Sequence, residues 1–407
     1  MGRDDAHIGR RVREIRTWRR MSLTATAELA GMTGGYLSMI ERGLRAITKR
    51  SVLEALAHAL RVSPSELTGQ PYTAADPVSA EGRAALNEVR VALDAYELGL
   101  DPEITPRPWP LLAADAHRLN TDLRADYAGQ GAILPDLLAE LHAAYVRDPE
   151  HRRDALIALM YAYYAATCTT KNLGGVDGWP LLAALHARSV AEELDAPEWL
   201  AYAAYLRAYA TGQQNRPHQH ASVIRALDQI GPHTNTDIVQ VAGMLHLSAA
   251  LASTAQGKAE EARLHLAEAT HLTTHLPDNP DQNPNFAYLY FSRDNVGIWS
   301  VGLNTDLGEG GRVAEIARDV HPETIPAPDR QGIYWSDLGR ALACEPATRD
   351  QSVQSLIRAE RIAPQLIRTR PLVRETVLGL LPKVAHSSNT SRELRGLAYR
   401  MGIAPTR

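Results

Sequence analysis

The amino-acid sequence predicts an all-α protein: a small N-terminal bundle of five helices followed by a long array of helix pairs. From Glu81 onward, apolar residues recur with helical spacing in segments of about 12 to 20 residues, separated by Pro, Gly or Asn. No segment shows the alternation of a half-buried strand. The chain is rich in Ala, only 6% of its residues are aromatic, and two of its 407 residues are Phe. Such a composition favours helices that pack closely through small side chains.

The first helix of the bundle is predicted over Ile8 to Arg19. Ile8, Val12 and Ile15 follow the spacing of a buried helical stripe, and Trp18 extends it by a turn. The many arginines of this helix are expected on its solvated face.

Residues 22 to 43 predict two short helices joined by a tight turn. Ser22 is suited to cap the first helix, because its hydroxyl accepts from a free backbone N–H. Gly31 allows the chain to leave that helix through a left-handed conformation. Thr33 caps the second helix, and Gly43 ends it. The apolar stripe of this second helix is Tyr36, Leu37 and Ile40.

Two further helices complete the bundle, over Val52 to Leu60 and over Pro64 to Leu67. The run Leu37-Ser38-x-Ile40-Glu41-Arg42-Gly43 and the closing Val62-Ser63-Pro64-x-Glu66-Leu67 resemble the lambda-repressor/Cro-like (XRE) DNA-binding domain. The resemblance covers residues 8 to 68, about one sixth of the chain.

The resemblance implies that Thr33 to Arg42 is the recognition helix, which such domains lay in the major groove of DNA. It also implies that Glu41 holds the following loop by hydrogen bonds. Our candidate DNA-binding residues are Thr33, Gly34, Gly35, Tyr36, Ser38, Arg42, Arg45, Lys49 and Arg50. The last four are expected to bind phosphate.

The recognition helix departs from the family pattern at two places. Gly34 and Gly35 stand where a long polar side chain is common, and Leu23 replaces the usual phosphate-binding Gln. Direct readout needs side chains that pair with base edges. We therefore expect modest base discrimination, or recognition through DNA shape.

The charge distribution agrees with a nucleic-acid partner for the N-terminal part. Residues 1 to 70 contain 12 basic and 7 acidic residues, whereas the rest of the chain contains 31 and 40. A basic domain attached to an acidic body orients the encounter with phosphate.

Residues 69 to 80 are predicted to form a polar linker that contains two prolines. A helical domain over residues 81 to 407 is predicted to follow it. Two of its helix pairs resemble tetratricopeptide repeats, because small residues stand where paired helices approach. The first unit has Ala249, Ala250, Gly257, Ala262, Leu266 and Ala269. The second has Trp335, Leu338, Gly339, Ser352, Leu356, Ala359 and Pro364.

Stacked helix pairs form a superhelix whose inner face is an extended binding surface. Aromatic residues mixed with amide and basic groups suit a peptide or a small polar ligand. Our candidate ligand-binding residues are Tyr164, Lys171, Asn172, Tyr205, Tyr209, Tyr288, Arg293 and Asn295. For any single tyrosine, half-buried packing remains the alternative.

We expect no enzymatic activity, metal or cofactor. The sequence has no Gly-rich phosphate loop or nucleophile elbow, and His271 and His275, with His265 earlier, lack a carboxylate or thiolate to complete a zinc set. Cys168 and Cys344 are expected to be buried as small apolar residues. With no signal peptide and no apolar run of about 18 residues, we expect a cytoplasmic protein with no membrane contact.

The predicted function is a sequence-specific transcriptional regulator. Its layout looks like that of the peptide-responsive regulators of Gram-positive bacteria, which implies a homodimer on double-stranded DNA and a peptide or small-molecule effector. The alternative is a DNA-tethered scaffold for protein partners, without a small ligand.

Overall fold

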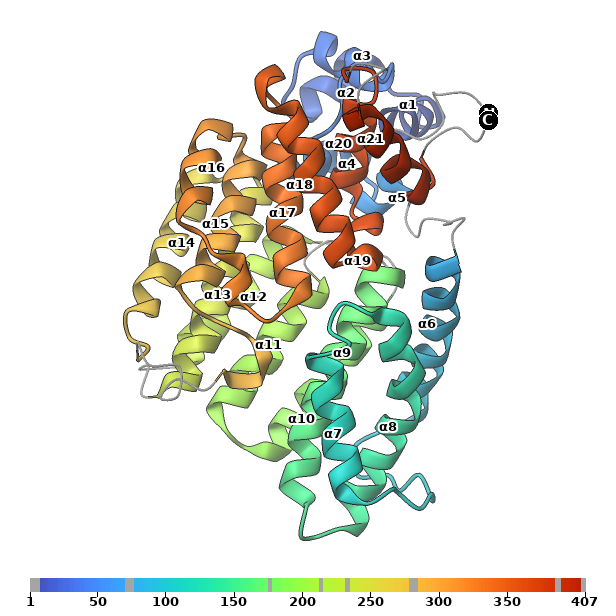
Figure 1. The fold of residues 1–407 in the computed structure, drawn as a ribbon, viewed down its shortest axis with the longest axis vertical. Helices are drawn as coiled ribbons and strands as arrows, with labels where there is room; N and C mark the ends of the chain where they lie inside the picture. Colours follow the sequence, from blue (N-terminus) through green and yellow to red (C-terminus); the bar gives the residue numbers. More distant parts are fainter. Residues whose placement is uncertain are drawn as a thin grey trace.

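The computed structural model describes residues 8–69, 77–174, 178–211, 215–230, 235–277, 285–384 and 389–403. These residues form helices, turns and loops and no strand, which confirms the predicted all-α class. Figure 1 shows a small N-terminal bundle, α1 to α5, seated on one end of a long helical array, α6 to α21.

The N-terminal bundle has its five helices close to the predicted positions. They are α1 (Ile8–Trp18), α2 (Leu23–Leu29), α3 (Gly34–Glu41), α4 (Arg50–Leu60) and α5 (Pro64–Thr68). Ser22 Oγ accepts from the N–H of Ala25 at 3.1 Å. Thr33 Oγ1 accepts from the N–H of Tyr36 at 3.2 Å. Gly31 between the two helices has a φ of 65°, as the tight turn requires.

One ion pair inside the bundle was not expected from the sequence. Arg16 of α1 donates two hydrogen bonds, of 2.6 and 2.8 Å, to the carboxylate of Glu41 in α3. Glu41 therefore anchors its helix to α1 instead of holding the following loop, and Arg16 leaves the solvated face. Trp18, in contrast, does not extend the buried stripe, since it is 76% exposed.

The helical array begins earlier than predicted, because α6 starts at Pro77, inside the expected linker; residues 70 to 76 of that linker lie outside the described residues. The array consists of α6 (Pro77–Ala95), α7 (Trp109–Asn120), α8 (Tyr127–Arg147), α9 (Arg152–Gly174), α10 (Trp179–Leu194), α11 (Pro197–Thr211), α12 (Arg216–Ile230), α13 (Thr236–Ala255), α14 (Ala259–Thr273), α15 (Arg293–Leu307), α16 (Gly310–Ile316), α17 (Pro328–Leu342), α18 (Arg349–Ile362), α19 (Pro364–Thr369), α20 (Pro371–Leu380) and α21 (Asn389–Arg400).

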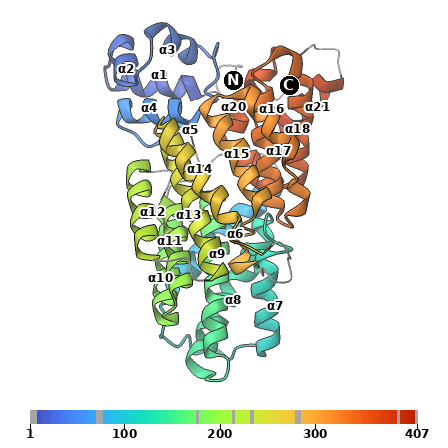
Figure 2. The same cartoon turned by 90° about the vertical axis from the view of Figure 1, so that its left-hand side faces the viewer.

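Successive helices of the array pack against each other, as in a repeat protein. Helices α6 to α10 occupy the end far from the bundle, and α11 to α16 follow one side (Figures 1 and 2). The chain then turns back, so that α19 contacts α9 and α6, while α20 lies beside the N-terminal bundle and α21 packs on α18 and α20. The array therefore curls on itself instead of forming an open arc.

The two predicted repeat units are closely packed pairs, α13 with α14 and α17 with α18. In the first pair, Ala249, Ala250, Ala262 and Ala269 are buried. In the second, Ser352 Oγ donates to the carbonyl of Gly339 at 2.7 Å. A Cβ added at Gly339 would lie 2.8 Å from Cγ of Leu356. Small residues at these places therefore allow the helices to approach, as the sequence pattern indicates.

Helix α13 is long and apolar enough to cross a membrane, with a mean hydropathy of 1.4 over its most apolar window. The sequence analysis did not anticipate this. However, 89% of that window is buried inside the protein, where α13 contacts α11, α12, α14 and α15. Its apolar character is that of a central packing helix.

Glu375 of α20 holds the N-terminal bundle from the other end of the chain. Its Oε1 accepts from the N–H of Ile8 at 2.9 Å, and its carboxyl also accepts from the N–H of Ile47. The side chain is buried, and this burial raises the pKa of Glu375 to about 7 despite the two N–H donors.

We expect Gly339→Ala to lower the free energy of unfolding by about 1–3 kcal/mol, because the added methyl group overpacks the contact with Leu356. Urea denaturation followed by circular dichroism measures this change. The matched control is Gly311→Ala in α16, where an added Cβ meets nothing within 4 Å. That control should be neutral or slightly stabilising, since Ala favours helix over Gly. Equal effects of the two substitutions would refute the close packing.

The pKa of Glu375 predicts a pH dependence of stability. The folded protein binds the Glu375 proton more tightly than the unfolded chain, whose pKa is near 4.5. The stability contributed by the protonated group is thus complete below pH 4.5 and is lost as the pH rises through about 7. Glu375→Gln retains an acceptor for the N–H of Ile8 and cannot ionise. The stability difference between variant and wild type should therefore grow in favour of the variant across this range, whereas parallel pH curves would contradict the burial.

Candidate DNA-binding face and interdomain cavity

Helix α3 exposes one side to solvent while the other side completes the core of the bundle. Leu37, Ile40 and Glu41 are buried. The exposed residues of the helix and its caps are Thr33, Gly35, Met39 and Arg42, and the partly exposed ones are Gly34, Tyr36 and Ser38. The predicted recognition helix is therefore not covered by the helical array in this structure.

The two glycines at the start of α3 are not required by packing. A Cβ added at Gly34 or Gly35 would meet nothing within 4 Å. Their absence of side chains leaves the backbone of the helix N-terminus open to a partner. Backbone N–H groups at such a position favour anions.

The predicted phosphate-binding residues separate into two groups. Arg42 and Arg45 are exposed, and Arg42 Nε donates to the carbonyl of Ser38 at 3.2 Å. Lys49 Nζ instead donates to the carbonyl of Leu307 in the array at 3.3 Å. Arg50 Nε forms an ion pair with Asp306 at 3.0 Å, and its side chain is only 20% exposed. We therefore retain Arg42 and Arg45 as phosphate-binding candidates and leave Lys49 and Arg50 out.

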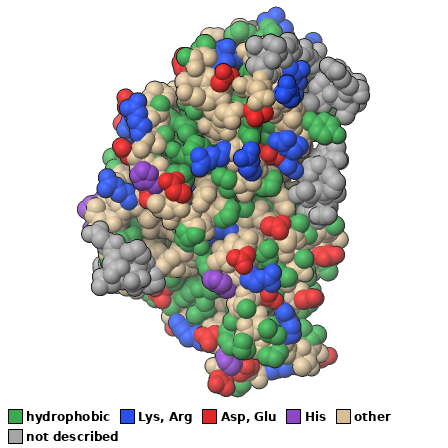
Figure 3. Space-filling view, in the orientation of Figure 1, with side chains coloured by type: hydrophobic (Ala, Val, Ile, Leu, Met, Phe, Trp, Pro, Cys, Tyr) green, Lys and Arg blue, Asp and Glu red, His purple; other side chains and the backbone are tan. Residues whose placement is uncertain are grey.

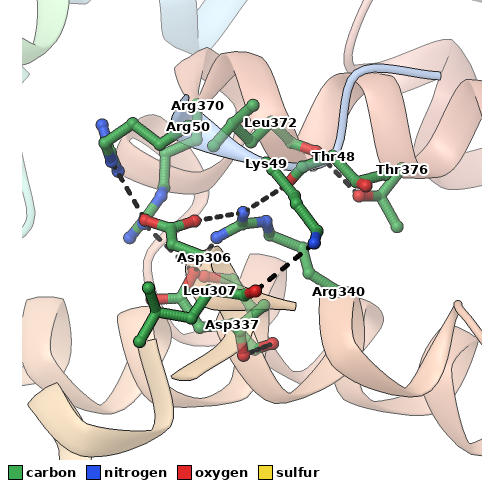
Figure 4. Close-up of polar contacts among 12 residues, drawn as sticks. Thr48, Lys49, Arg50, Asp306, Leu307, Asp337, Arg340, Arg370, Leu372 and Thr376 are labelled. Carbon is green, nitrogen blue, oxygen red and sulfur yellow. Dashed lines mark hydrogen bonds and ion pairs between the residues drawn. The ribbon is translucent and has the colours of Figure 1, made fainter. Parts of the chain in front are cut away.

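Asp306 of α15 is the centre of the contact between bundle and array (Figure 4). Its carboxylate receives Arg50 from the bundle and Arg340 from α17, the latter at 2.6 Å. Arg340 also donates to the carbonyl of Thr48 at 2.8 Å and to Asp337 at 2.9 Å. Burial acts to raise the pKa of Asp306, but the charges of Arg340 and Arg50 outweigh it and hold the pKa at about 2. The carboxylate is thus ionised at physiological pH.

A second ion pair joins the two parts beside the first. Glu54 of α4 and Arg216 of α12 are 3.2 Å apart, and Arg216 also donates to Gln219 at 2.9 Å. Burial, together with the nearby charge of Arg50, lowers the pKa of Arg216 to about 10.

A cavity of about 240 Å³ lies between the bundle and the array. The bundle lines it through α4 and α5, with residues that include Arg50, Leu53, Glu54 and Thr68. Five of the eight predicted ligand-binding residues line the array side: Tyr164, Lys171, Asn172, Tyr205 and Tyr209. The curled array thus brings together residues from α9 and α11 that the sequence analysis had placed on separate helices.

The other three predicted ligand-binding residues do not line this cavity. Tyr288 hydrogen-bonds to Nδ1 of His117 at 2.7 Å, and Arg293 is exposed. Asn295 is buried and accepts from Arg330 Nε at 3.0 Å, so it holds a residue of the cavity wall.

Several lining residues were not predicted from the sequence. Arg124, Arg216, Trp299, Asp329 and Arg330 come from different parts of the array. No local pattern distinguishes these charged residues from ones on a solvated helix face, because their burial depends on the curvature of the array.

The histidines and cysteines also differ from expectation. His265 lies beside His220 at 3.3 Å and His246 at 3.1 Å, which α12 and α13 supply. Among the described residues, no group of His, Cys, Asp and Glu forms a metal-binding arrangement. Cys168 is buried, whereas Cys344 is exposed near the end of α17, contrary to the expectation for it.

Surface charge on the array is mixed. Lys and Arg side chains occur together with Asp and Glu side chains across the face shown in Figure 3.

Comparison with known proteins identifies the kind of domain that the N-terminal bundle forms. Residues 7–68 match the model of a family described as a helix-turn-helix domain. Over 99 residues the chain is 28% identical to an uncharacterized HTH-type transcriptional regulator, y4wC, of Sinorhizobium fredii (strain NBRC 101917 / NGR234). That match covers 24% of this chain and 66% of the relative. No solved structure matches the chain. The N-terminal bundle is therefore a helix-turn-helix domain.

Proposed function

We propose that the protein is a sequence-specific DNA-binding transcriptional regulator that uses α3 as its recognition helix. The observation that carries the proposal is the exposure of α3 along Thr33, Gly35 and Arg42, while Leu37 and Ile40 fix the helix to the core. The helix-turn-helix family match and the printed name of the relative support the same function.

The roles of the residues follow from their exposure. Arg42 and Arg45 bind phosphate, because they are exposed cations next to the helix. Ser38 reads a base edge, and Thr33 contributes at the N-terminus. Gly34 and Gly35 permit a close approach of the backbone to DNA, and Tyr36 lies between the core and the phosphates.

We further propose a cytoplasmic homodimer on DNA. A single short helix with few long polar side chains offers little base discrimination, and two copies double the number of contacts. Such dimers bind half-sites separated by about 34 Å or multiples of it.

We also propose that the helical array is the sensing part of the regulator, and the interdomain cavity supports this role. Both the bundle and the array line it, so a ligand bound there contacts both. A ligand with different affinities for two arrangements of these parts shifts their equilibrium. A coupling of about 1–3 kcal/mol changes DNA occupancy about 5- to 150-fold. A cavity lined by both parts favours a small effector over a scaffold role.

We expect Arg42→Ala to weaken binding to all duplexes alike and to reduce the slope of log affinity against log salt by about 1 per subunit, or about 2 for the proposed homodimer. Fluorescence anisotropy with an operator selected from random duplexes, over a series of salt concentrations, measures both effects. The control is Arg188→Ala on α10, an exposed arginine at the end of the array far from the bundle. An unchanged slope for Arg42→Ala would remove it from the phosphate contacts, and an absence of binding by the wild type at low salt would refute the proposed function.

Ser38→Ala should change the preferred sequence without changing the salt slope, since a hydroxyl that reads a base edge carries no charge. Selection of random duplexes by the wild type and by the variant compares the two motifs. Identical motifs would assign base recognition to backbone groups or to DNA shape instead.

A further inference from the structure

The charged groups that line the interdomain cavity do not balance. Six lining residues are basic: Arg50, Arg124, Lys171, Arg216, Arg330 and Arg370. Four are acidic: Glu54, Asp306, Asp329 and Asp337. Each acid forms an ion pair with one of the arginines: Arg216 with Glu54, Arg50 with Asp306, Arg124 with Asp329 and Arg370 with Asp337.

Lys171 is one of the two basic residues left over. Its ammonium donates to the carbonyl of Tyr209 at 2.8 Å and lies 3.3 Å from the centre of the Tyr209 ring. In the described part of the chain, no carboxylate lies within ion-pair distance of it. Burial lowers the pKa of Lys171 well below its ordinary value, and the charges of Arg216, Arg50 and Arg370 lower it further. Three arginines thus act on Lys171 as positive charges, and an anion placed beside Lys171 favours its ammonium form.

Within the ranges that the structure describes, Arg330 is the second basic residue of the cavity wall without a carboxylate partner. Its side chain stacks over the ring of Trp299 at 4.9 Å, and its Nε donates to Asn295. The residue is 8% exposed, and its Nη2 has no hydrogen-bond partner among the described residues. A buried donor of a charged group without a partner carries a large desolvation cost. Arg330 also lines the cavity and has no carboxylate partner in the described part of the chain, so its guanidinium adds positive charge to the cavity wall.

The remaining wall is aromatic and aliphatic. Tyr164, Tyr205, Tyr209 and Trp299 line it together with apolar residues such as Met244 and Leu289. A cavity of about 150 Å³ is enough for a benzene molecule. The 240 Å³ here thus suit a molecule of about ten non-hydrogen atoms, which is smaller than a peptide of several residues.

We propose that the cavity binds a small organic anion with an aromatic or aliphatic body, whose acidic group pairs with Lys171 and whose second oxygen accepts from Arg330. The anion supplies the negative charge that the protein itself does not place there. A carboxylate and a phosphate share this chemistry. The inference deepens the sensing part of the proposed function and rests on it.

Occupancy of this site favours the arrangement in which the bundle is docked on the array. The cavity is complete only when α4 and α5 close it, so a ligand that fills it binds the docked form more tightly. In addition, an anion at Lys171 reduces the repulsion between Lys171 and Arg50, which comes from the bundle.

The test uses the purified full chain and pairs of matched probes. Indole-3-acetate, phenylacetate and phenyl phosphate are the anions, and indole-3-acetamide and phenylacetamide are the uncharged counterparts of the two carboxylates. Isothermal titration and the melting temperature report binding, while hydrogen exchange of α4 and α5 reports docking. We expect at least one anion to bind about tenfold or more tightly than its amide, as a charge-assisted hydrogen bond implies. Preference between phenylacetate and phenyl phosphate distinguishes a carboxylate from a phosphate ligand.

Lys171→Met should abolish the preference for the anion over its amide. Arg330→Gln should weaken the binding of the anion. The control is Lys258→Met, whose lysine is exposed at the start of α14. Because Lys171→Met replaces an amine that has no carboxylate partner with an apolar side chain of similar size, the melting temperature without probe should remain equal or rise, which separates loss of binding from loss of folding. Amides that bind as well as the anions, no binding by any anion, or a preference retained by Lys171→Met would overturn the inference.

The DNA assay keeps this result distinct from that of the proposed function. If the protein binds an anion but does not bind DNA, only the proposed regulator function is refuted. DNA binding by a chain that rejects every anion would refute only the anion site.

Discussion

The position of the helix-turn-helix domain depends on a buried electrostatic contact in which Asp306 receives Arg50 from that domain and Arg340 from the array. Arg340 is almost fully buried and binds the Thr48 carbonyl as well, so the start of α4 is held by both a charge and a backbone contact. Breaking a buried pair by removing one partner typically costs about 3–5 kcal/mol, because the remaining charge lacks a partner. This contact therefore sets where α3 points relative to the array.

The same contact forms one wall of the cavity. Arg50 pairs with Asp306 and also contributes its positive charge to the Lys171 end. A ligand in the cavity and the docking of the domain are thus linked through shared groups, without a separate pathway between distant sites. In the proposed regulator, the binding energy of such a ligand acts directly on the residues that hold the domain in place.

Much of the N-terminal bundle could be predicted from the sequence. The Ser22 and Thr33 caps, the positive φ at Gly31 and the buried Leu37 and Ile40 are all local features, and the structure agrees with each. The predictions failed where burial depended on distant contacts. Arg16 left the solvated face to pair with Glu41, and Trp18 remained exposed.

The sequence by itself determined the all-α class, the helix-turn-helix and five of the aromatic and polar residues that line the cavity. These depend on helical spacing, capping and composition, which act over a few residues. Only the tertiary structure decided that Arg50 binds Asp306, 256 positions away, instead of remaining free. It also decided that Lys171 faces a cavity closed by α4 and α5. The side of a helix that becomes buried depends on the curvature of the whole array, which is the sum of many packing angles and is not encoded in any one segment.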